Sequence, residues 1–215
     1  MFIKQIMSSV PITISPEAGI LEAANLMKEK KIRRLPVVKG DKLVGIITEM
    51  DILKVQPSQA TTLSVFEVNY LLTKMRVSDV MTKNPLTISA EATLEEAALI
   101  MRENEVGGLP VLANNKLVGV ITESNIFDAF IDLLGLKRAG TRLTIEVIDR
   151  PGILAEIGQI TAKHNVNVSS FAAYYPEEKK SVLVVRLEAT KVEEICKDIE
   201  KLGHKVTHIA HYGIK

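Results

Sequence analysis

The chain has 215 residues, enough for two or more domains, and its 47% hydrophobic and 25% charged residues are typical of a globular protein. A net charge of +1 leaves no broad positive surface for a nucleic-acid backbone, and no apolar run is long enough to span a bilayer. A single cysteine excludes an internal disulfide, and the start MFIKQIMSSVP lacks a secretory h-region, so we expect a cytoplasmic protein with neither nucleic-acid nor membrane partners.

A tandem repeat dominates the first two thirds of the chain. Residues 6–53 align with residues 80–127 without a gap. The matched segments are PITISPEA (11–18) with PLTISAEA (85–92), LPVV (35–38) with LPVL (109–112), and KLVGIITE (42–49) with KLVGVITE (116–123). The alignment indicates that one structural unit has been duplicated.

Each repeat predicts the order strand–helix–strand–strand–helix. The expected elements are a short strand (11–14, 85–88), a helix (20–30, 94–104), two strands across a polar turn (39–41, 113–115), and a helix from residue 49 or 123. A unit of this size buries little surface alone, so we expect the two repeats to pack together.

The stretch GIITEMD (45–51) carries the clearest chemistry. A strand ending at Thr48 and a helix starting before Asp51 place a hydroxyl and a carboxylate at one rim. A carboxylate can accept hydrogen bonds from both vicinal hydroxyls of a ribose, the helix N-terminus adds backbone donors, and Ile and Val side chains offer an apolar slot for a flat base. The alternative is that Thr48 and Asp51 only cap the helix.

Each repeat resembles a CBS motif, and the two together resemble a CBS pair, or Bateman module. The first repeat shows the whole signature, in Thr13-Ile14, in LPVV (35–38), and in Gly45 through Asp51. The resemblance covers about residues 4–136 and implies a regulatory module that binds an adenine nucleotide (AMP, ADP or ATP) or an S-adenosylmethionine-like ligand. The binding residues that it implies are Ile12, Thr13, Ile14, Arg33, Arg34, Pro36, Val37, Thr48, Asp51, Leu86, Thr87, Ile88, Pro110, Val111, Thr122 and Asn125.

The resemblance also implies that each cleft takes residues from both repeats. Thr48 and Asp51 then face Leu86 and Thr87 of the second repeat. In the other cleft, Thr122 and Asn125 face Ile12 and Thr13 of the first repeat.

Two departures distinguish the second repeat from the first. Asn125 replaces Asp51, which we interpret as a weaker acceptor for a ribose, and Gly107-Gly108 replaces Arg33-Arg34, a place that holds phosphate-binding cations in the family. Alternatively, the arginines belong to a solvated basic helix end. The sequence therefore predicts that the Asp51 cleft takes a phosphorylated nucleotide, whereas the Asn125 cleft is weak, empty or suited to a neutral adenosyl group.

The segment between the repeats predicts a loop, QPSQATT (56–62), and an amphipathic helix at 64–75 without evident chemistry. We therefore divide the chain into a first CBS motif (1–57), a linker helix (58–76), a second CBS motif (77–138) and a C-terminal domain (139–215).

The C-terminal domain predicts strand–helix–strand–strand–helix–strand, the ferredoxin-like order. The expected strands are 142–148, 166–173, 181–187 and 206–210, and the expected helices start near Pro151, ending at Asn165, and span 191–202. IEVIDRPGILAEIGQITAKHNVNV (145–168) resembles an ACT domain, which implies an amino-acid-like effector at Asp149, Gly152, Ile153, Leu154 and Asn167. Alternatively, this domain only dimerises.

The expected fold class is thus α/β (α+β), with a pseudo-two-fold CBS pair and a βαββαβ ACT domain. The sequence shows no catalytic constellation and no metal-ligand cluster, and Cys196 follows the spacing of a buried helical face. This combination resembles the acetoin-utilisation type of CBS-domain protein. We therefore expect a non-catalytic, homodimeric regulator of a partner enzyme, with a purely structural scaffold as the alternative.

Overall fold

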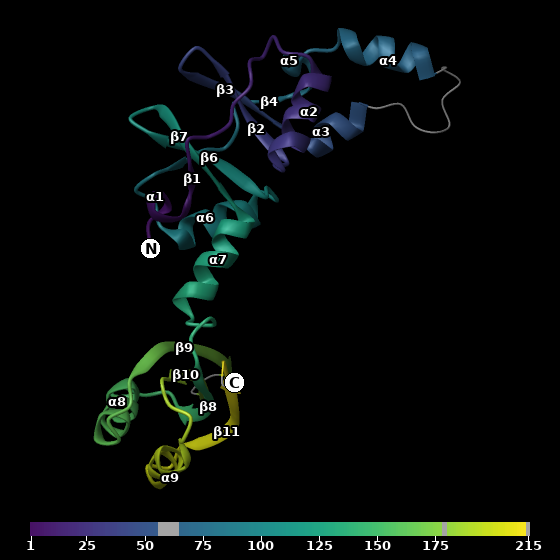
Figure 1. Cartoon of the computed structure of the whole chain (residues 1–215). Coiled ribbons are helices and arrows are strands. Elements are labelled where there is room, and N and C mark those ends of the chain that lie inside the picture. The colour runs from purple at the N-terminus through teal and green to yellow at the C-terminus, as the bar shows by residue number, and fades with distance from the viewer. Residues whose placement is uncertain (56–64, 178–179, 214–215) are drawn as a thin grey trace. The chain divides into compact units, whose positions relative to one another are not determined.

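The computed structural model describes residues 1–55, 65–177 and 180–213 of the chain, which is traced in Figure 1. The chain divides into two compact units, Met1–Ile126 and Phe127–Lys215. The first unit contains two small sheets and the second contains one four-stranded sheet.

The two repeats fold alike, as their matching sequences predict. Each contributes a helix, an antiparallel strand pair and a second helix. These are α2 (Ile20–Lys30), β2 (Arg34–Lys39), β3 (Lys42–Thr48) and α3 (Glu49–Val55), and then α6 (Leu94–Glu103), β6 (Gly108–Ala113), β7 (Lys116–Thr122) and α7 (Glu123–Leu133). Asn114 and Asn115 both adopt positive φ, as a two-residue type I′ hairpin turn requires.

Two short strands cross between the repeats. β1 (Ser8–Ser9) of the first repeat pairs with β7 of the second, and β4 (Thr82–Lys83) of the second pairs with β3 of the first. Both pairs are antiparallel, and each strand occupies the same place in its own repeat. This exchange joins the repeats through backbone hydrogen bonds. It also brings the segment that follows β1 close to β7, and the segment that follows β4 close to β3.

The strands predicted at 11–14 and 85–88 are largely wrong. Ile14 makes only an isolated bridge with Val37, and β5 (Ile88–Ser89) covers only the end of the second predicted strand. Pro11 and Pro85 open these segments, and proline has no N–H to donate to a ladder.

The segment that precedes each repeat also forms helix. α4 (Val65–Lys74) lies within the predicted linker helix, while the predicted loop at 56–62 lies outside the described residues. The sequence analysis missed α1 (Ile3–Ile6) and α5 (Val77–Val80), because a four-residue helix is too short to show a helical period. Ile3 and Val77 are nonetheless fully buried.

The core of the first repeat gathers apolar side chains from its strands and helices. Its buried members are Ile14, Ala23, Met27, Leu35, Val37, Ile47, Ile52 and Val77. The side chains of Ile14 and Val37, two predicted binding residues, therefore pack inward. The matching pair in the second repeat, Ile88 and Val111, is equally buried, so the side chains of all four residues serve packing and their predicted part in binding would rest on the backbone.

The second unit has the predicted ferredoxin-like fold. Its elements are β8 (Gly140–Ile148), α8 (Ile153–Lys163), β9 (Val168–Glu177), β10 (Lys180–Leu187), α9 (Glu193–Lys201) and β11 (Lys205–Tyr212). The sheet order is β11-β8-β10-β9, with every neighbouring pair antiparallel. Residues alternate along β8, where Leu143, Ile145 and Val147 are buried.

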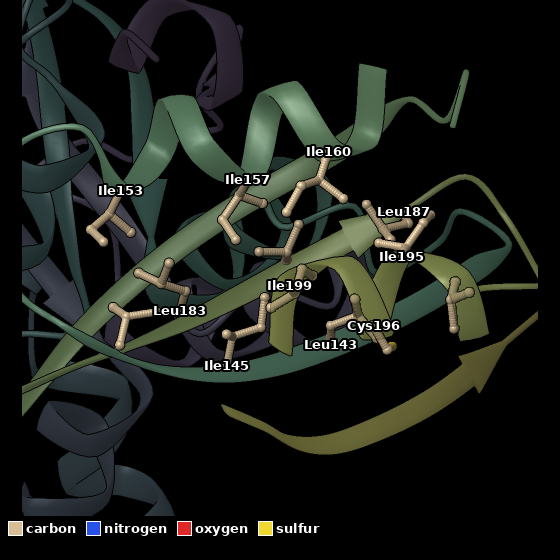
Figure 2. Close-up of a cluster of buried hydrophobic side chains, with 13 residues drawn as sticks. Leu143, Ile145, Ile153, Ile157, Ile160, Leu183, Leu187, Ile195, Cys196 and Ile199 are labelled. Atoms are coloured by element: carbon tan, nitrogen blue, oxygen red, sulfur yellow. The ribbon is translucent and has the colours of Figure 1, made fainter. Parts of the chain in front are cut away.

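Helices α8 and α9 pack on the same face of this sheet, and Figure 2 shows the resulting core. Ile157 of α8 and Ile195 of α9 are 1% and 2% exposed. Cys196 lies in this cluster, as its spacing predicts, and burial raises the pKa of its thiol. The cysteine is therefore a core residue.

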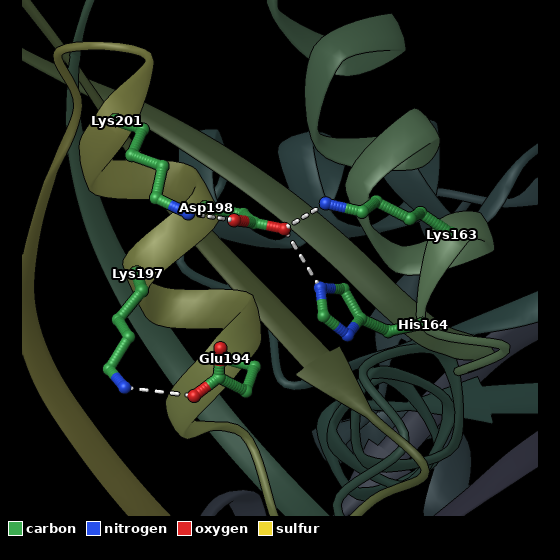
Figure 3. Close-up of polar contacts among 6 residues, drawn as sticks. All are labelled: Lys163, His164, Glu194, Lys197, Asp198 and Lys201. Carbon is green, nitrogen blue, oxygen red and sulfur yellow. Dashed lines mark hydrogen bonds and ion pairs between the residues drawn. The ribbon is translucent and has the colours of Figure 1, made fainter.

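A polar cluster on α9 also joins the two helices (Figure 3). Asp198 accepts from Lys163 at 2.7 Å, from Lys201 at 2.8 Å and from the His164 ring at 3.0 Å. These hydrogen bonds, with that of Lys163 the largest influence, lower the pKa of the Asp198 carboxyl far below its usual range.

Candidate functional site

Each repeat makes the same hydrogen-bonded turn between its last strand and its second helix. In the first repeat, Oδ2 of Asp51 accepts from the Thr48 N–H at 2.9 Å and from the Thr48 hydroxyl at 2.7 Å. The hydroxyl in turn accepts from the Asp51 N–H at 3.2 Å. This is the capping arrangement that was the alternative to ligand binding. Within the described residues Oδ1 of Asp51 has no partner, so capping and a ligand contact are compatible.

Asn125 takes the same place in the second repeat. Its Oδ1 accepts from the Thr122 N–H at 3.0 Å and from the Thr122 hydroxyl at 2.7 Å. A backbone N–H can only donate, so the amide oxygen must point to Thr122 and the NH₂ group must be the free end. The sequence analysis treated Asn125 as a weaker acceptor. That is corrected, because the free end of Asn125 is a donor, whereas the free end of Asp51 is an acceptor.

A cavity of about 440 Å³ opens at the Asn125 turn. Residues of both repeats line it: Ser8, Val10, Pro11, Ile12, Lys31, Ile32, Arg33, Arg34, Pro36, Gly107, Val120, Thr122, Glu123, Ser124 and Asn125. Ile12 thus lies with Thr122 and Asn125, the crossing that the resemblance implies for this cleft. Ile12, Ile32 and Val120 supply apolar walls, and a pocket of this size that joins such walls to polar groups suits a small ligand with a flat base.

The two arginines of the first repeat lie at this same cavity. We predicted Arg33 and Arg34 for the Asp51 cleft because they belong to the same repeat, whereas both line the Asn125 cavity. The Arg34 side chain crosses to the second repeat, where a Cβ added at Gly108 would overlap its guanidinium and lie 2.9 Å from the Ile121 carbonyl oxygen. The glycines that seemed to deprive the second repeat of a cation therefore make room for one.

The environment of Arg34 is half-buried and incompletely paired. Its Nη1 is buried and has no hydrogen-bond partner among the described residues. Burial lowers the pKa of Arg34, while the nearby Glu123 carboxylate opposes that change, and an arginine stays charged in either case. Because Nη1 is buried against Gly108, a ligand in the cavity accepts from the other guanidinium nitrogens of Arg34, which offer charge-assisted hydrogen bonds.

Lys31 and Arg33 each line two recesses. Besides the Asn125 cavity, they border a second recess of about 440 Å³ that is lined only by the first repeat and includes Glu49. Lys31 follows α2 in the left-handed conformation, with φ of 54°, and its counterpart Glu105 has φ of 53°.

Val10 at the cavity has an unusual backbone. Its φ is 61°, in the left-handed region that β-branched residues avoid, and its side chain is 87% exposed. The matching residue of the second repeat is Asn84, with φ of 48°. Asparagine tolerates this conformation far better than valine does.

The remaining predicted residues of the repeats divide by position. Pro36 and Pro110 are buried in β2 and β6, with Pro36 also lining the cavity, and Thr13 is half-buried. Leu86 and Thr87 are exposed after β4, the strand that pairs with β3 of the first repeat, which supports but does not test their predicted place beside Asp51. Ser8, Val10, Lys31, Glu123 and Ser124 were not predicted, although the last two directly precede Asn125 in GVITESN (119–125), the counterpart of GIITEMD.

The residues predicted for an effector in the second unit do not share one environment. Asp149 and Leu154 are exposed, whereas Ile153 is a core residue. Gly152 is the N-cap of α8 with φ of 96°, and Asn167 donates to Glu188 at 3.0 Å. A cavity of about 530 Å³ in this unit is lined by Glu146, Val147, Ile148, Tyr174, Pro176, Lys180, Ser181, Val182, Gly203 and Lys205, none of which was predicted.

The family follows from comparison with known proteins. The model of the CBS domain matches residues 3–58 and 77–132, and that of the TTHA0829-like ACT domain matches residues 139–210. This chain belongs to the CBS-domain family. It is a CBS pair with a C-terminal ACT domain, and both parts have the folds that the sequence predicts. No helix in the described residues is long and apolar enough to cross a membrane.

The curated relatives of this CBS-domain protein differ in length. It is 33% identical over 171 residues to an inosine-5'-monophosphate dehydrogenase of Korarchaeum cryptofilum, 74% of this chain but 33% of that enzyme. It is 36% identical over 134 residues to a CBS domain-containing protein of Dictyostelium discoideum, 61% of this chain and 92% of that protein. The chain thus spans only a third of the dehydrogenase.

Solved structures resemble the CBS pair. One is assigned to acetoin utilization (AcuB) in Vibrio cholerae, with 30% identity and a TM-score of 0.53 over 64% of this chain and 95% of that one. CBSX2 in complex with AMP has 27% identity and a TM-score of 0.52, over 60% and 96%. The CBS pair of MJ0100, in complex with 5'-methylthioadenosine and S-adenosyl-L-methionine, has 29% identity and a TM-score of 0.51, over 64% and 98%.

Proposed function

We propose that this CBS-domain protein is a non-catalytic regulator that senses an adenine nucleotide or an adenosyl compound at its CBS pair. The observation that carries the proposal is the cavity at Asn125, which combines apolar walls from both repeats, a hydrogen-bonding turn of the second repeat and cations of the first. The complexes of CBSX2 with AMP and of the MJ0100 pair with adenosyl ligands support the same ligand class.

The cavity residues suit the parts of such a ligand. Ile12, Ile32 and Val120 form a slot for the base, and the turn of Thr122 and Asn125 lies at the rim for a ribose. At the other predicted cleft, Oδ1 of Asp51, which has no partner among the described residues, is proposed to accept from ribose hydroxyls.

Ligand binding would act on the arrangement of the two repeats. Because the cavity takes residues from both, a ligand that fits one relative placement of the repeats better than another shifts the equilibrium between them by its difference in affinity. We propose that this shift changes the affinity for a partner enzyme. The likeness to the AcuB structure makes enzymes of acetoin catabolism the first partners to test.

The ACT domain is proposed to bind an amino-acid-like effector. Gly152 holds the turn before α8 in a left-handed conformation, and Asp149 and Leu154 are exposed beside it. The N-terminus of an eleven-residue helix attracts a carboxylate, the group that every amino acid carries. A thermal-shift screen of the amino acids on the full chain, repeated with Gly152→Ala, tests this part.

Isothermal titration calorimetry of the full chain tests the main proposal. The ligands are AMP, ADP, ATP, 5'-methylthioadenosine and S-adenosylmethionine, with UMP as a control for the base. We expect at least one adenine compound to bind and UMP to bind at least tenfold more weakly. If none binds, the nucleotide proposal is refuted.

That outcome would favour the alternative, a scaffold in which both units only associate. We propose that the chain is a homodimer in either case, which sedimentation analysis can check. A ligand that binds without changing the oligomer or the affinity for a partner would argue against the regulatory mechanism, but not against the site.

A further inference from the structure

Hydrogen-bond donors dominate the polar lining of the Asn125 cavity. The side chains that can only donate to a ligand are those of Lys31, Arg33, Arg34 and Asn125, whereas the hydroxyls of Ser8 and Ser124 can donate or accept; Glu123 is the one carboxylate among the lining residues. Three of the donors are cations. A cavity with this lining favours a ligand rich in acceptors, and an anion above all.

The free end of Asn125 adds to this preference. Its amide oxygen is occupied by Thr122, at 3.0 Å from the N–H and 2.7 Å from the hydroxyl, so it presents only NH₂ to a ligand. The corresponding free atom of Asp51 in the other cleft is a carboxylate oxygen, which repels a phosphate. The substitution of aspartate by asparagine therefore reverses the hydrogen-bonding polarity at one rim without disturbing the turn.

Arg34 is a second difference between the two clefts. Its backbone lies opposite Thr48 of its own repeat, yet its guanidinium lies against Gly108 of the second repeat, with Nη1 buried and without a partner in the part of the chain that the structure describes. The second repeat has no equivalent arginine that could reach the Asp51 cleft, because its matching residues are Gly107 and Gly108. Arg34 thus contributes its charge to the Asn125 cavity.

We propose that the Asn125 cavity, rather than the Asp51 cleft, takes the phosphorylated ligand, and that Arg34 sets this selectivity. Gly108 is the positioning residue, because any larger side chain there displaces the guanidinium. The inference rests on the proposed function, since it presumes that the CBS pair binds a nucleoside. It assigns the phosphate to the repeat that the motif comparison alone would reject.

The test compares AMP with adenosine, which differ only in the phosphate. Calorimetry on the full chain gives the two dissociation constants, and the preference for AMP is their ratio. Arg34→Gln removes the charge but keeps an amide donor. We expect it to lower the preference about tenfold to a hundredfold, the range for one charge-assisted hydrogen bond. Asn125→Asp should lower the preference as well, because it adds a carboxylate to the cavity.

One control isolates the site. Arg102→Gln removes an exposed arginine in the last turn of α6, outside the cavity, and should leave the preference unchanged.

Gly108→Ala tests the position of the guanidinium without changing any charge. The added methyl group should reduce the preference for AMP as Arg34→Gln does, whereas strain against the Ile121 carbonyl oxygen, 2.9 Å away, would weaken AMP and adenosine alike and leave their ratio unchanged. The double variant should lose no more of the preference than either single variant, because both changes remove one interaction. Equal losses that add in the double variant would show that Gly108 does not act through Arg34.

The outcomes distinguish this inference from the proposed function. If AMP and adenosine bind equally well, or if Asp51→Asn rather than Arg34→Gln removes the preference, the inference is wrong while the nucleoside site stands. If neither compound nor any adenosyl ligand binds, both fail. Loss of the preference in Arg34→Gln, with normal adenosine binding, supports both.

Discussion

Val10 allows a direct measurement of backbone strain at the cavity. Its φ of 61° is unfavourable for a β-branched residue, and Asn84 occupies the same place in the second repeat with φ of 48°. The left-handed conformation costs an ordinary residue about 1–2 kcal/mol, and asparagine much less. Val10 is 87% exposed, so replacing it loses little burial. Val10→Asn should therefore stabilise the first unit by about 1 kcal/mol, or raise its melting temperature by roughly 3–5 °C.

The reciprocal variant Asn84→Val provides the internal control. It places valine in the same strained conformation and should lower the free energy of unfolding by a similar amount. Both variants are measured by urea denaturation and by thermal melting, followed by circular dichroism, against the unchanged protein. If Val10→Asn is neutral or destabilising while Asn84→Val is harmless, neither site is strained and the argument from φ is refuted. A valine retained despite this cost would indicate a contact with the ligand, so Val10→Asn should also weaken AMP binding.

Two further predictions concern the ACT domain. The pKa of Asp198 is lowered in the folded state, so its ionisation stabilises the fold above its unfolded pKa, near 3.8, and that stability is lost as the pH falls below this value. Asp198→Asn should therefore flatten the dependence of the unfolding free energy on pH between about 5 and 2. An unchanged slope in urea denaturation at acid pH would contradict the cluster in Figure 3. Ile157→Ala should lower the free energy of unfolding by about 2–5 kcal/mol, because Ile157 is 1% exposed. Leu154 lies three residues earlier and is 59% exposed, so Leu154→Ala should lower it by less than about 0.5 kcal/mol. Similar losses for the two variants in urea denaturation would disprove the assigned buried face of α8.

Duplication made much of the fold predictable. Two copies of one pattern identified α2, α6 and the strand pairs, because the helical faces and the hairpin turns are local properties of the chain. The same logic failed for the segments after Pro11 and Pro85, where an alternating pattern ended in extended chain instead of strand, since proline cannot donate to a neighbour. The fold of the ACT domain was likewise predicted from the sequence, including the burial of Cys196.

The candidate site was predictable in its parts and not in its assembly. GIITEMD and GVITESN located the turns of Thr48 and Thr122, and the hydrogen bonds there are those that short-range spacing allows. What an alignment of the repeats could not show is which free atom each turn leaves. That depended on the orientation of the Asn125 amide, which the Thr122 N–H decides.

Sequence alone determined the repeat, the two fold types, the turns and the kind of ligand to consider, because these follow from local spacing and residue chemistry. Only the tertiary structure decided where the charges lie. Arg34 and Gly108 belong to different repeats and stand far apart in the chain, yet the exchange of β1 and β4 brings the repeats together, and the absence of a Cβ at Gly108 admits the arginine. A long side chain reaches across an interface that no alignment of one repeat on the other can represent.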